Sequence, residues 1–229
     1  MQYDGVKAQQ AGETRPRPIV IGLTGPIASG KSTVAGHLRD RGADTVDADR
    51  VYRSLLVPGS ELVRRIVDRF GPGVVAANDE IDRSALGDLV FQDAEALADL
   101  DHITHPIVVD EIRNTIARST APVVVVEAIK LGQSGLATDI DSLWLVTADE
   151  PSRLQRLMKR AGMDETRARA RIAAASGRVP DGMRVDREID NSGEISATLR
   201  AVDDAWQALL SEAADTHQDL MMNSQEEHS

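Results

Sequence analysis

The chain has 229 residues, of which 41% are hydrophobic and 3% aromatic, and it contains no cysteine. A chain of this size and composition can bury one α/β core, but it cannot form disulfides or thiolate metal sites. Its formal net charge of -11 argues against a broad nucleic-acid-binding surface, because such surfaces need clustered Lys and Arg.

Both ends of the chain are polar and lack periodicity. We expect disordered tails at 1–17 and, with acidic character, at 214–229, on either side of one domain at 18–213. No apolar run precedes Ile19, and none approaches the roughly 20 residues that a membrane span requires. We therefore expect a soluble cytoplasmic protein, present as a monomer or small homo-oligomer.

Short β-branched runs alternate with helical stretches within this domain. The alternation predicts an α/β fold with a parallel five-stranded sheet and covering helices. The run Val123–Val126 is wholly apolar, which indicates a central strand buried on both faces. The strands are expected at 19–21, 43–46, 123–126, 143–146 and 187–189. Helices are expected after Lys31 and over 152–160, 165–174 and 194–210.

Two helical regions lie outside this alternation. The region 50–119 has helical periodicity interrupted at glycine, proline and asparagine, and predicts an inserted helical lobe. At about 153–180, two arginine-rich helices joined at Gly162 suit a mobile lid over a triphosphate. Most of these arginines are expected on a solvated helix face, and Arg160, at a helix end, is the one we assign to the site.

The segment Gly25–Thr33 satisfies the pattern G-x-x-x-x-G-K-S/T between a predicted strand and a predicted helix. Backbone N–H groups at such a helix N-terminus bind phosphate. The alternative is a glycine-rich turn that contains Lys and Ser by chance, but such a turn would not need to lie between a strand and a helix. Lys31 is expected to reach the β- and γ-phosphates, and Ser32 to ligate Mg²⁺. The pattern predicts ATP or GTP binding without identifying the acceptor. The expected nucleotide contacts are Gly25, Ala28, Ser29, Gly30, Lys31, Ser32 and Thr33.

Carboxylates follow two of the predicted strands. Asp47 and Asp49 come after the second strand, where the strands of a parallel sheet end at a ligand crevice. One of them could orient the acceptor hydroxyl or accept its proton, and the alternative for Asp49 is a cap on a helix that begins at Arg50. Glu127 ends the valine strand and is expected to support Mg²⁺ or its waters, the alternative being a solvated strand-end acid.

His102 and His105 lie three residues apart, but the sequence supplies no third ligand for a zinc site. His105 precedes Pro106 and could serve in an acceptor pocket or as a structural hydrogen-bonding residue.

Several separate stretches resemble the dephospho-coenzyme A kinase family, in order and nearly without gaps, over about Ile19 to Leu210. They are Ile21-Gly22-Leu23-Thr24-Gly25 with the loop, Val46-Asp47-Ala48-Asp49 with Arg53 and Pro58-Gly59, Phe70-Gly71, Ile81-Asp82-Arg83 with Leu86 and Phe91, His105-Pro106, Arg156-Leu157-Met158 with Arg160, Ala168 with Arg171-Ile172-Ala173-Ala174, and Ile189-Asp190-Asn191-Ser192-Gly193.

This resemblance implies phosphorylation of the ribose 3′-hydroxyl of dephospho-coenzyme A, with Mg²⁺-ATP as donor, to give coenzyme A. It implies a three-layer P-loop kinase fold made of a nucleotide core, a helical acceptor lobe and a lid. Carried over residue by residue, Asp49 is the catalytic carboxylate beside the acceptor hydroxyl, and together with Lys31 of the loop and Arg160 of the lid it makes up the expected catalytic set. Arg53, Arg83 and His105 lie in or beside the acceptor site.

The chain departs from the family's pattern after the third strand. Where the family reads Asp-x-Pro-Leu-Leu-x-Glu, this chain reads Glu127-Ala128-Ile129-Lys130-Leu131-Gly132-Gln133, and Thr147 and Ala175 replace a frequent aspartate and glutamine. Two alternatives therefore stay open. One is a related P-loop small-molecule kinase with a shifted acceptor, since Lys130 adds a positive charge. The other is a non-catalytic nucleotide-binding regulatory protein, against which the retention of Lys31, Ser32 and Asp49 counts.

Overall fold

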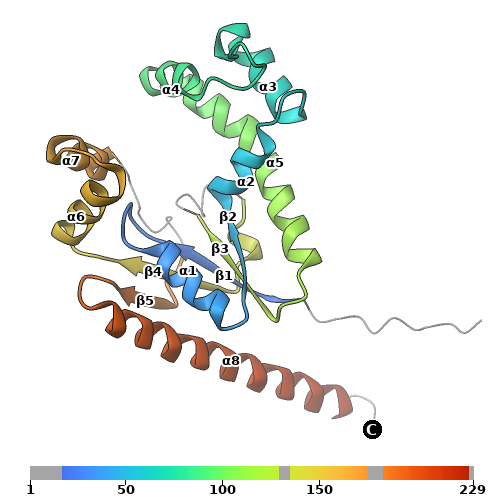
Figure 1. Cartoon of the computed structure of the whole chain (residues 1–229). Helices are drawn as coiled ribbons and strands as arrows, with labels where there is room; N and C mark the ends of the chain where they lie inside the picture. The colour runs from blue at the N-terminus through green and yellow to red at the C-terminus, as the bar shows by residue number, and fades with distance from the viewer. Residues whose placement is uncertain (1–16, 129–134, 175–182, 227–229) are drawn as a thin grey trace, which may run out of the picture.

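The structure is a computed structural model that describes residues 17–128, 135–174 and 183–226, with side chains up to 215 except those of 160 and 161. A parallel five-stranded sheet with strand order β2-β3-β1-β4-β5 forms its centre (Figure 1). All five predicted strands are present, with boundaries that differ from prediction by at most three residues. They are β1 (Ile19–Thr24), β2 (Asp44–Asp47), β3 (Val123–Glu127), β4 (Ser142–Thr147) and β5 (Arg187–Asp190).

Helices cover both faces of this sheet, so the predicted α/β fold with three layers is confirmed. On one face, α1 (Lys31–Asp40) and α8 (Ile195–Glu226) pack against alternate strand residues such as Ile21 and Val125. On the other face, α5 (Ala94–Arg118) packs against the intervening residues, including Val124. The side chains of β3 from Val123 to Val126 are fully buried, as expected for a central strand with both faces covered.

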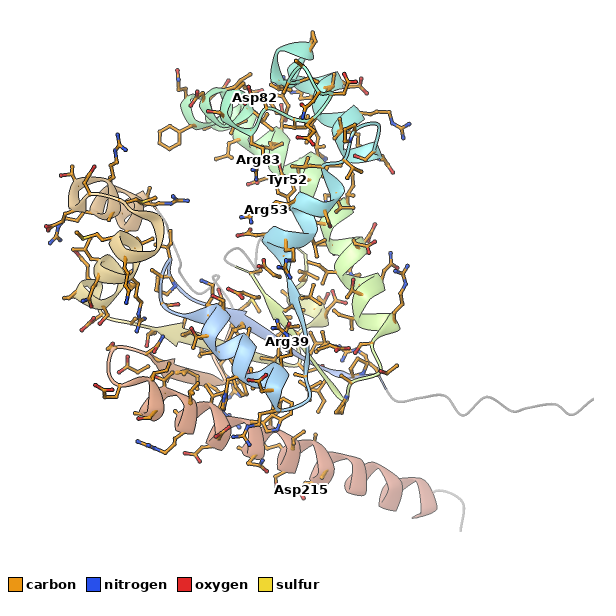
Figure 2. The ribbon with its side chains drawn as sticks, viewed as in Figure 1. Arg39, Tyr52, Arg53, Asp82, Arg83 and Asp215 are labelled. Atoms are coloured by element: carbon orange, nitrogen blue, oxygen red, sulfur yellow. The ribbon has the colours of Figure 1, made fainter. Side chains whose placement is uncertain are left out.

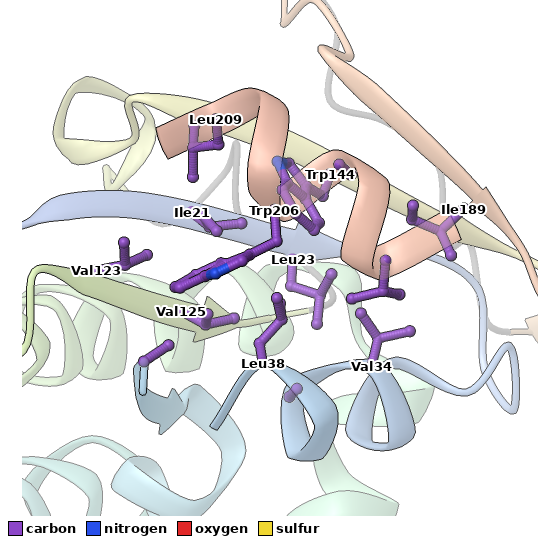
Figure 3. Close-up of a cluster of buried hydrophobic side chains, with 14 of the residues drawn as sticks. Ile21, Leu23, Val34, Leu38, Val123, Val125, Trp144, Ile189, Trp206 and Leu209 are labelled. Carbon is purple, nitrogen blue, oxygen red and sulfur yellow. The ribbon is translucent and has the colours of Figure 1, made fainter. Parts of the chain in front are cut away.

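The core between the sheet and the α1–α8 layer contains both tryptophans of the chain (Figure 3). Trp206 lies on α8 and is 5% exposed, and Trp144 lies on β4 and is fully buried. The Trp144 indole N–H donates to the Ser142 hydroxyl at 3.0 Å, so burial leaves this polar group satisfied. This layer fixes the sheet that carries the site.

The predicted helical lobe rises from the sheet after β2 and returns through α5 (Figure 1). It has its own apolar cluster, centred on Leu62, Ile66 and Leu86. Side-chain caps begin three of its helices: Asp47, Ser60 and Asp82 each accept from backbone N–H groups of the first turn. The lobe consists of α2 (Ala48–Leu55), α3 (Glu61–Phe70), the 3₁₀ turn η1 (Pro72–Val74), α4 (Arg83–Gln92) and the first part of α5.

Two helices occupy most of the region predicted as a lid: α6 (Glu150–Ala161) and α7 (Glu165–Ala174), joined at Gly162 in the left-handed conformation. A short 3₁₀ turn, η3 (Ala137–Asp139), precedes β4. Leu157 and Ile172 pack with Ile27 and Ala28 of the predicted phosphate-binding loop, so the lid rests directly on this loop.

The C-terminal segment differs from expectation. We expected a disordered tail from 214, but α8 continues to Glu226. The sequence after Gly193 contains neither glycine nor proline and is rich in Ala, Glu, Gln, Leu and Met, so nothing in it ends a helix. The predicted disorder at 1–16 and 227–229 falls outside the described residues. Among the described helices, none has the length and apolarity to cross a membrane.

Candidate active site

The segment Gly25–Gly30 forms a loop between β1 and α1, as the motif predicts. The backbone of Gly25 has φ 147°, and a Cβ there would lie 2.2 Å from the Val146 carbonyl oxygen, so only glycine fits. Gly30 has φ 103° and precedes α1 without a capping side chain. The first N–H groups of this helix are therefore not covered by a capping side chain, and they offer an anion-binding end.

A pocket of about 980 Å³ lies over this loop. Of the seven predicted nucleotide contacts, Ala28, Gly30, Lys31, Ser32 and Thr33 line it. The other two do not line it: the Gly25 carbonyl accepts a hydrogen bond from Lys31, and the Ser29 side chain is fully buried. The remaining lining residues are Ile27, Glu127, Arg156, Leu157, Lys159, Arg171, Asn191, Gly193 and Ile195.

Lys31 is the most buried of the basic groups in this pocket, with 7% of its surface exposed. Its Nζ donates to the carbonyl oxygens of Gly25, at 3.0 Å, and Pro26, at 3.3 Å. Burial lowers the pKa of Lys31 from its ordinary value, while the negative charges of Glu127, Asp49 and Asp47 act to raise it. Three carboxylates thus lie within electrostatic reach of the lysine.

The strand ends explain how these carboxylates meet. Glu127 at the end of β3 pairs in register with Leu23 of β1 and with Asp47 of β2. Parallel strands end at the same edge of the sheet, so the loop and the acids share that edge. Asp47 caps α2 by accepting from the Arg50 N–H at 3.1 Å. The helix begins at Ala48 and not at Arg50, so Asp49 lies in its first turn and does not cap it.

A second pocket, of about 340 Å³, opens between the sheet edge and the helical lobe. Asp49 and His105 both line it, together with apolar side chains of α5. His105 Nε2 lies 3.5 Å from Asp101 Oδ1, one helical turn away. The structure thereby brings two of the four predicted acceptor residues to one cavity.

Arg53 and Arg83 are not among the residues that line this cavity. They lie with Tyr52 on the side of the lobe that faces α6 and α7 (Figure 2). Burial raises the pKa of Tyr52, and the positive charge of Arg83 opposes that rise. Arg83 is therefore close to the Tyr52 ring, which does line the cavity.

One arginine of α6 contacts the phosphate-binding loop. The Arg160 side chain lies outside the described residues, as do Ile129, Lys130, Gln133 and Ala175. Arg156, one turn earlier, reaches the loop: its Nη1 donates to the Ser29 carbonyl at 3.1 Å. Thr147 is half-buried at the end of β4, and its carbonyl accepts from the Asn191 N–H at 2.8 Å.

Sequence reasoning missed the part that Asn191 takes in this site. Its Nδ2 donates to the Ser29 carbonyl at 2.7 Å, across 162 residues of sequence. The available signal was its place directly after the last strand, at the edge of the sheet where ligands bind. Among the described residues, no group of three or more His, Asp or Glu could hold a metal ion by itself.

A parallel sheet with a phosphate-binding loop after its first strand, flanked by a helical lobe and a lid, defines a P-loop kinase. Comparison with known proteins narrows this class. The family model for dephospho-CoA kinase matches residues 19–197. A dephospho-CoA kinase of Moorella thermoacetica is 41% identical over 200 residues, which cover 86% of this chain and 94% of the relative. The dephospho-CoA kinase of Symbiobacterium thermophilum is 41% identical over 192 residues, which cover 82% of this chain and 80% of the relative.

Solved structures share the fold of this chain. The protein TT1252 from Thermus thermophilus has a TM-score of 0.68 and 31% identity, covering 86% of this chain and 98% of its own. A dephospho-CoA kinase from Campylobacter jejuni shares the fold, with a TM-score of 0.53 and 21% identity over 84% of this chain and 98% of its own. The chain belongs to the dephospho-CoA kinase family.

Proposed function

We propose that this protein transfers the γ-phosphoryl group of ATP to the ribose 3′-hydroxyl of dephospho-CoA, giving coenzyme A in the last step of its biosynthesis. The observation that carries the proposal is the position of Asp49. This carboxylate lines the cavity under the helical lobe, and its charge also acts on Lys31 in the nucleotide pocket. It therefore lies between a donor site and an acceptor site.

The donor half of the reaction rests on the loop and Lys31. The loop N–H groups and the start of α1 would hold the phosphates, and Lys31 would offset the charge that develops on the transferred group. Since phosphoryl transfer needs little covalent help, positioning and charge neutralisation supply most of the catalysis.

The residues present fit a magnesium ion bound together with the nucleotide. Ser32 is exposed in the pocket, and Glu127 lines it too, so two oxygen groups are available of the kind that Mg²⁺ prefers. Mg²⁺ bound with ATP neutralises charge on the β- and γ-phosphates. We propose Ser32 as a direct ligand and Glu127 as a partner of the ion or its waters.

The acceptor half rests on Asp49 and His105. We propose that Asp49 orients the attacking hydroxyl and accepts its proton, and that His105 donates a hydrogen bond to the acceptor. Arg53 and Arg83 would bind the diphosphate of dephospho-CoA, since both lie on the side of the lobe that faces the lid (Figure 2). Arg160 would contribute from α6 when the lid closes.

The test is a coupled assay of ADP release with ATP and purified dephospho-CoA. We expect acceptor-dependent turnover in the wild type and its loss, by about 10²-fold or more, in Asp49→Asn, because that carboxylate serves as the base. Asp47→Asn is the matched control, since asparagine caps a helix as well as aspartate does.

Two results would contradict the proposal. If the wild type binds ATP but releases no ADP on addition of dephospho-CoA, the acceptor is a different molecule or the protein does not transfer phosphate. Equal losses in Asp47→Asn and Asp49→Asn would show that the catalytic carboxylate has been misassigned.

A further inference from the structure

Two side chains from distant parts of the chain hold the backbone of the phosphate-binding loop. The Ser29 carbonyl accepts from Asn191 Nδ2 at 2.7 Å and from Arg156 Nη1 at 3.1 Å. The same Nη1 lies 3.3 Å from the Ala28 carbonyl oxygen. The centre of the loop is thus tied both to the segment after β5 and to the lid helix α6.

Asn191 is itself buried and hydrogen-bonded to residues of three other elements. It is 2% exposed, and its Oδ1 accepts from the Thr198 hydroxyl of α8 at 3.1 Å. Its backbone N–H donates to the Thr147 carbonyl at 2.8 Å, and its carbonyl accepts from Arg156 Nη2 at 2.6 Å. The two backbone contacts hold the residue in place, and the bond from Thr198 orients its side-chain amide so that the N–H points at Ser29.

The amide also packs directly against the loop. A Cβ at Gly30 would lie 2.0 Å from Asn191 Nδ2, a distance at which no side chain fits. Besides its positive φ, this contact is a second reason for glycine at the position. The close packing of Asn191 against the loop therefore requires glycine at position 30.

The contact has a consequence for phosphate binding through the geometry of the peptide group. In a planar trans peptide the C=O and the N–H point in opposite directions. When Asn191 and Arg156 hold the Ser29 carbonyl, they also fix the direction of the Gly30 N–H. Gly30 lines the nucleotide pocket. The two side chains thus set the direction of one of the N–H groups at the phosphate end of the pocket.

We infer that Asn191 is a positioning residue that keeps the phosphate-binding loop in its binding conformation, and that Arg156 shares this task by hydrogen bonding to loop carbonyls. Asn191 contributes by holding the loop ready before the nucleotide arrives, which lowers the ordering cost of binding. The inference rests on the proposed function only for the identity of the nucleotide.

The experiment measures ADP affinity by calorimetric titration of the full chain and of Asn191→Ala. We expect the Kd for ADP to rise about tenfold, since a buried carbonyl loses a partner and the loop loses its anchor. The KM for dephospho-CoA should change less than about twofold, because Asn191 is not among the residues of the acceptor cavity. Hydrogen exchange of the amides in 25–33 should speed up while the strands keep their protection.

Ser152→Ala is the matched control. The Ser152 hydroxyl donates to the Ser192 carbonyl at 3.2 Å, so it ties α6 to the same segment without touching the phosphate-binding loop. Its ADP affinity should equal that of the wild type. If Asn191→Ala does not fold, Thr198→Val replaces it: this variant removes the hydroxyl that orients the amide and should weaken ADP binding about threefold.

A purely structural role for Asn191 would lower the melting temperature and leave ADP affinity and loop exchange unchanged, and that result would overturn the inference. A wild type that binds ADP but does not phosphorylate dephospho-CoA would instead overturn the proposed function alone. The two failures are therefore distinguishable.

Discussion

The buried position of Lys31 leads to a prediction about stability and pH. The side chain is 7% exposed, and burial lowers its pKa below the ordinary 10.5 despite the opposing effect of Glu127, Asp49 and Asp47. The charged form of Lys31 is thus less favourable in the folded protein than in the unfolded chain. Lys31→Met keeps much of the side-chain volume and removes the charge.

The sign of the effect follows from proton binding. Between the lowered pKa of the folded state and 10.5, the unfolded chain carries the Lys31 proton and the folded protein does not. Stability therefore rises with pH in this window, by at most about 1.4 kcal/mol per pH unit for one proton. Below the window both states are protonated, and the contribution does not change with pH.

The assay is urea unfolding of the wild type and Lys31→Met at several pH values from neutral to about 10. The free energy of unfolding of the wild type, minus that of the variant, should increase as pH rises towards 10.5. Groups common to both proteins cancel in this difference. Lys159→Met, which removes an exposed lysine of the same pocket, controls for the loss of one charge. A difference that is flat or falls with pH would refute the reasoning. The same Lys31→Met variant should lose turnover by about 10²-fold or more.

Three further predictions concern other parts of the molecule. His105→Ala should raise the KM for dephospho-CoA about fivefold to tenfold in steady-state kinetics, with a smaller loss of rate than Lys31→Met, because it removes one hydrogen bond and no charge from the phosphates. Trp206→Ala should lower the free energy of unfolding by about 3–5 kcal/mol in urea titrations, since its ring lies in the core cluster; a loss below about 1 kcal/mol would contradict this packing. Removal of 216–229 should change that free energy by less than about 0.5 kcal/mol, because Leu210 is the last core-cluster residue among the α8 side chains that the structure describes, which extend to 215; a large loss would show that the helix end packs on the domain.

The parts of the site that were predictable from sequence are those that consecutive residues encode. The loop carries its glycines, its lysine and its hydroxyl within nine positions, so the pattern alone gives their roles. The run Val123–Val126 likewise encodes a buried central strand. The position of Glu127 in the pocket followed from this strand, because the end of a central parallel strand lies at the edge of the sheet where ligands bind.

The contacts that prediction missed depend on how elements pack. That Arg156 faces the loop is decided by the rotation of α6 about its axis, which the spacing of arginines in the sequence does not reveal. The bond from Asn191 to Ser29 joins residues 162 positions apart, and no local pattern encodes it. The cap of α2 is Asp47 and not the alternative considered, Asp49, because the helix starts two residues before Arg50, a difference within the ordinary scatter of helix ends.

The protein has a negative net charge and is expected to bind an anion, and the positions of its charged side chains make the two compatible. The chain has a formal net charge of -11, yet Lys31, Arg156, Lys159 and Arg171 line the nucleotide pocket against one acid, Glu127. At physiological ionic strength charges act over about 8 Å, so a ligand inside the pocket responds mainly to nearby charges, which are those four cations and the carboxylates around Lys31. A polyanion would extend beyond the pocket and be repelled by the net negative charge of the protein. A nucleotide fits within the 980 Å³ pocket and is therefore not repelled in this way. The acidic composition therefore favours small phosphorylated ligands over nucleic acids at the same phosphate-binding loop.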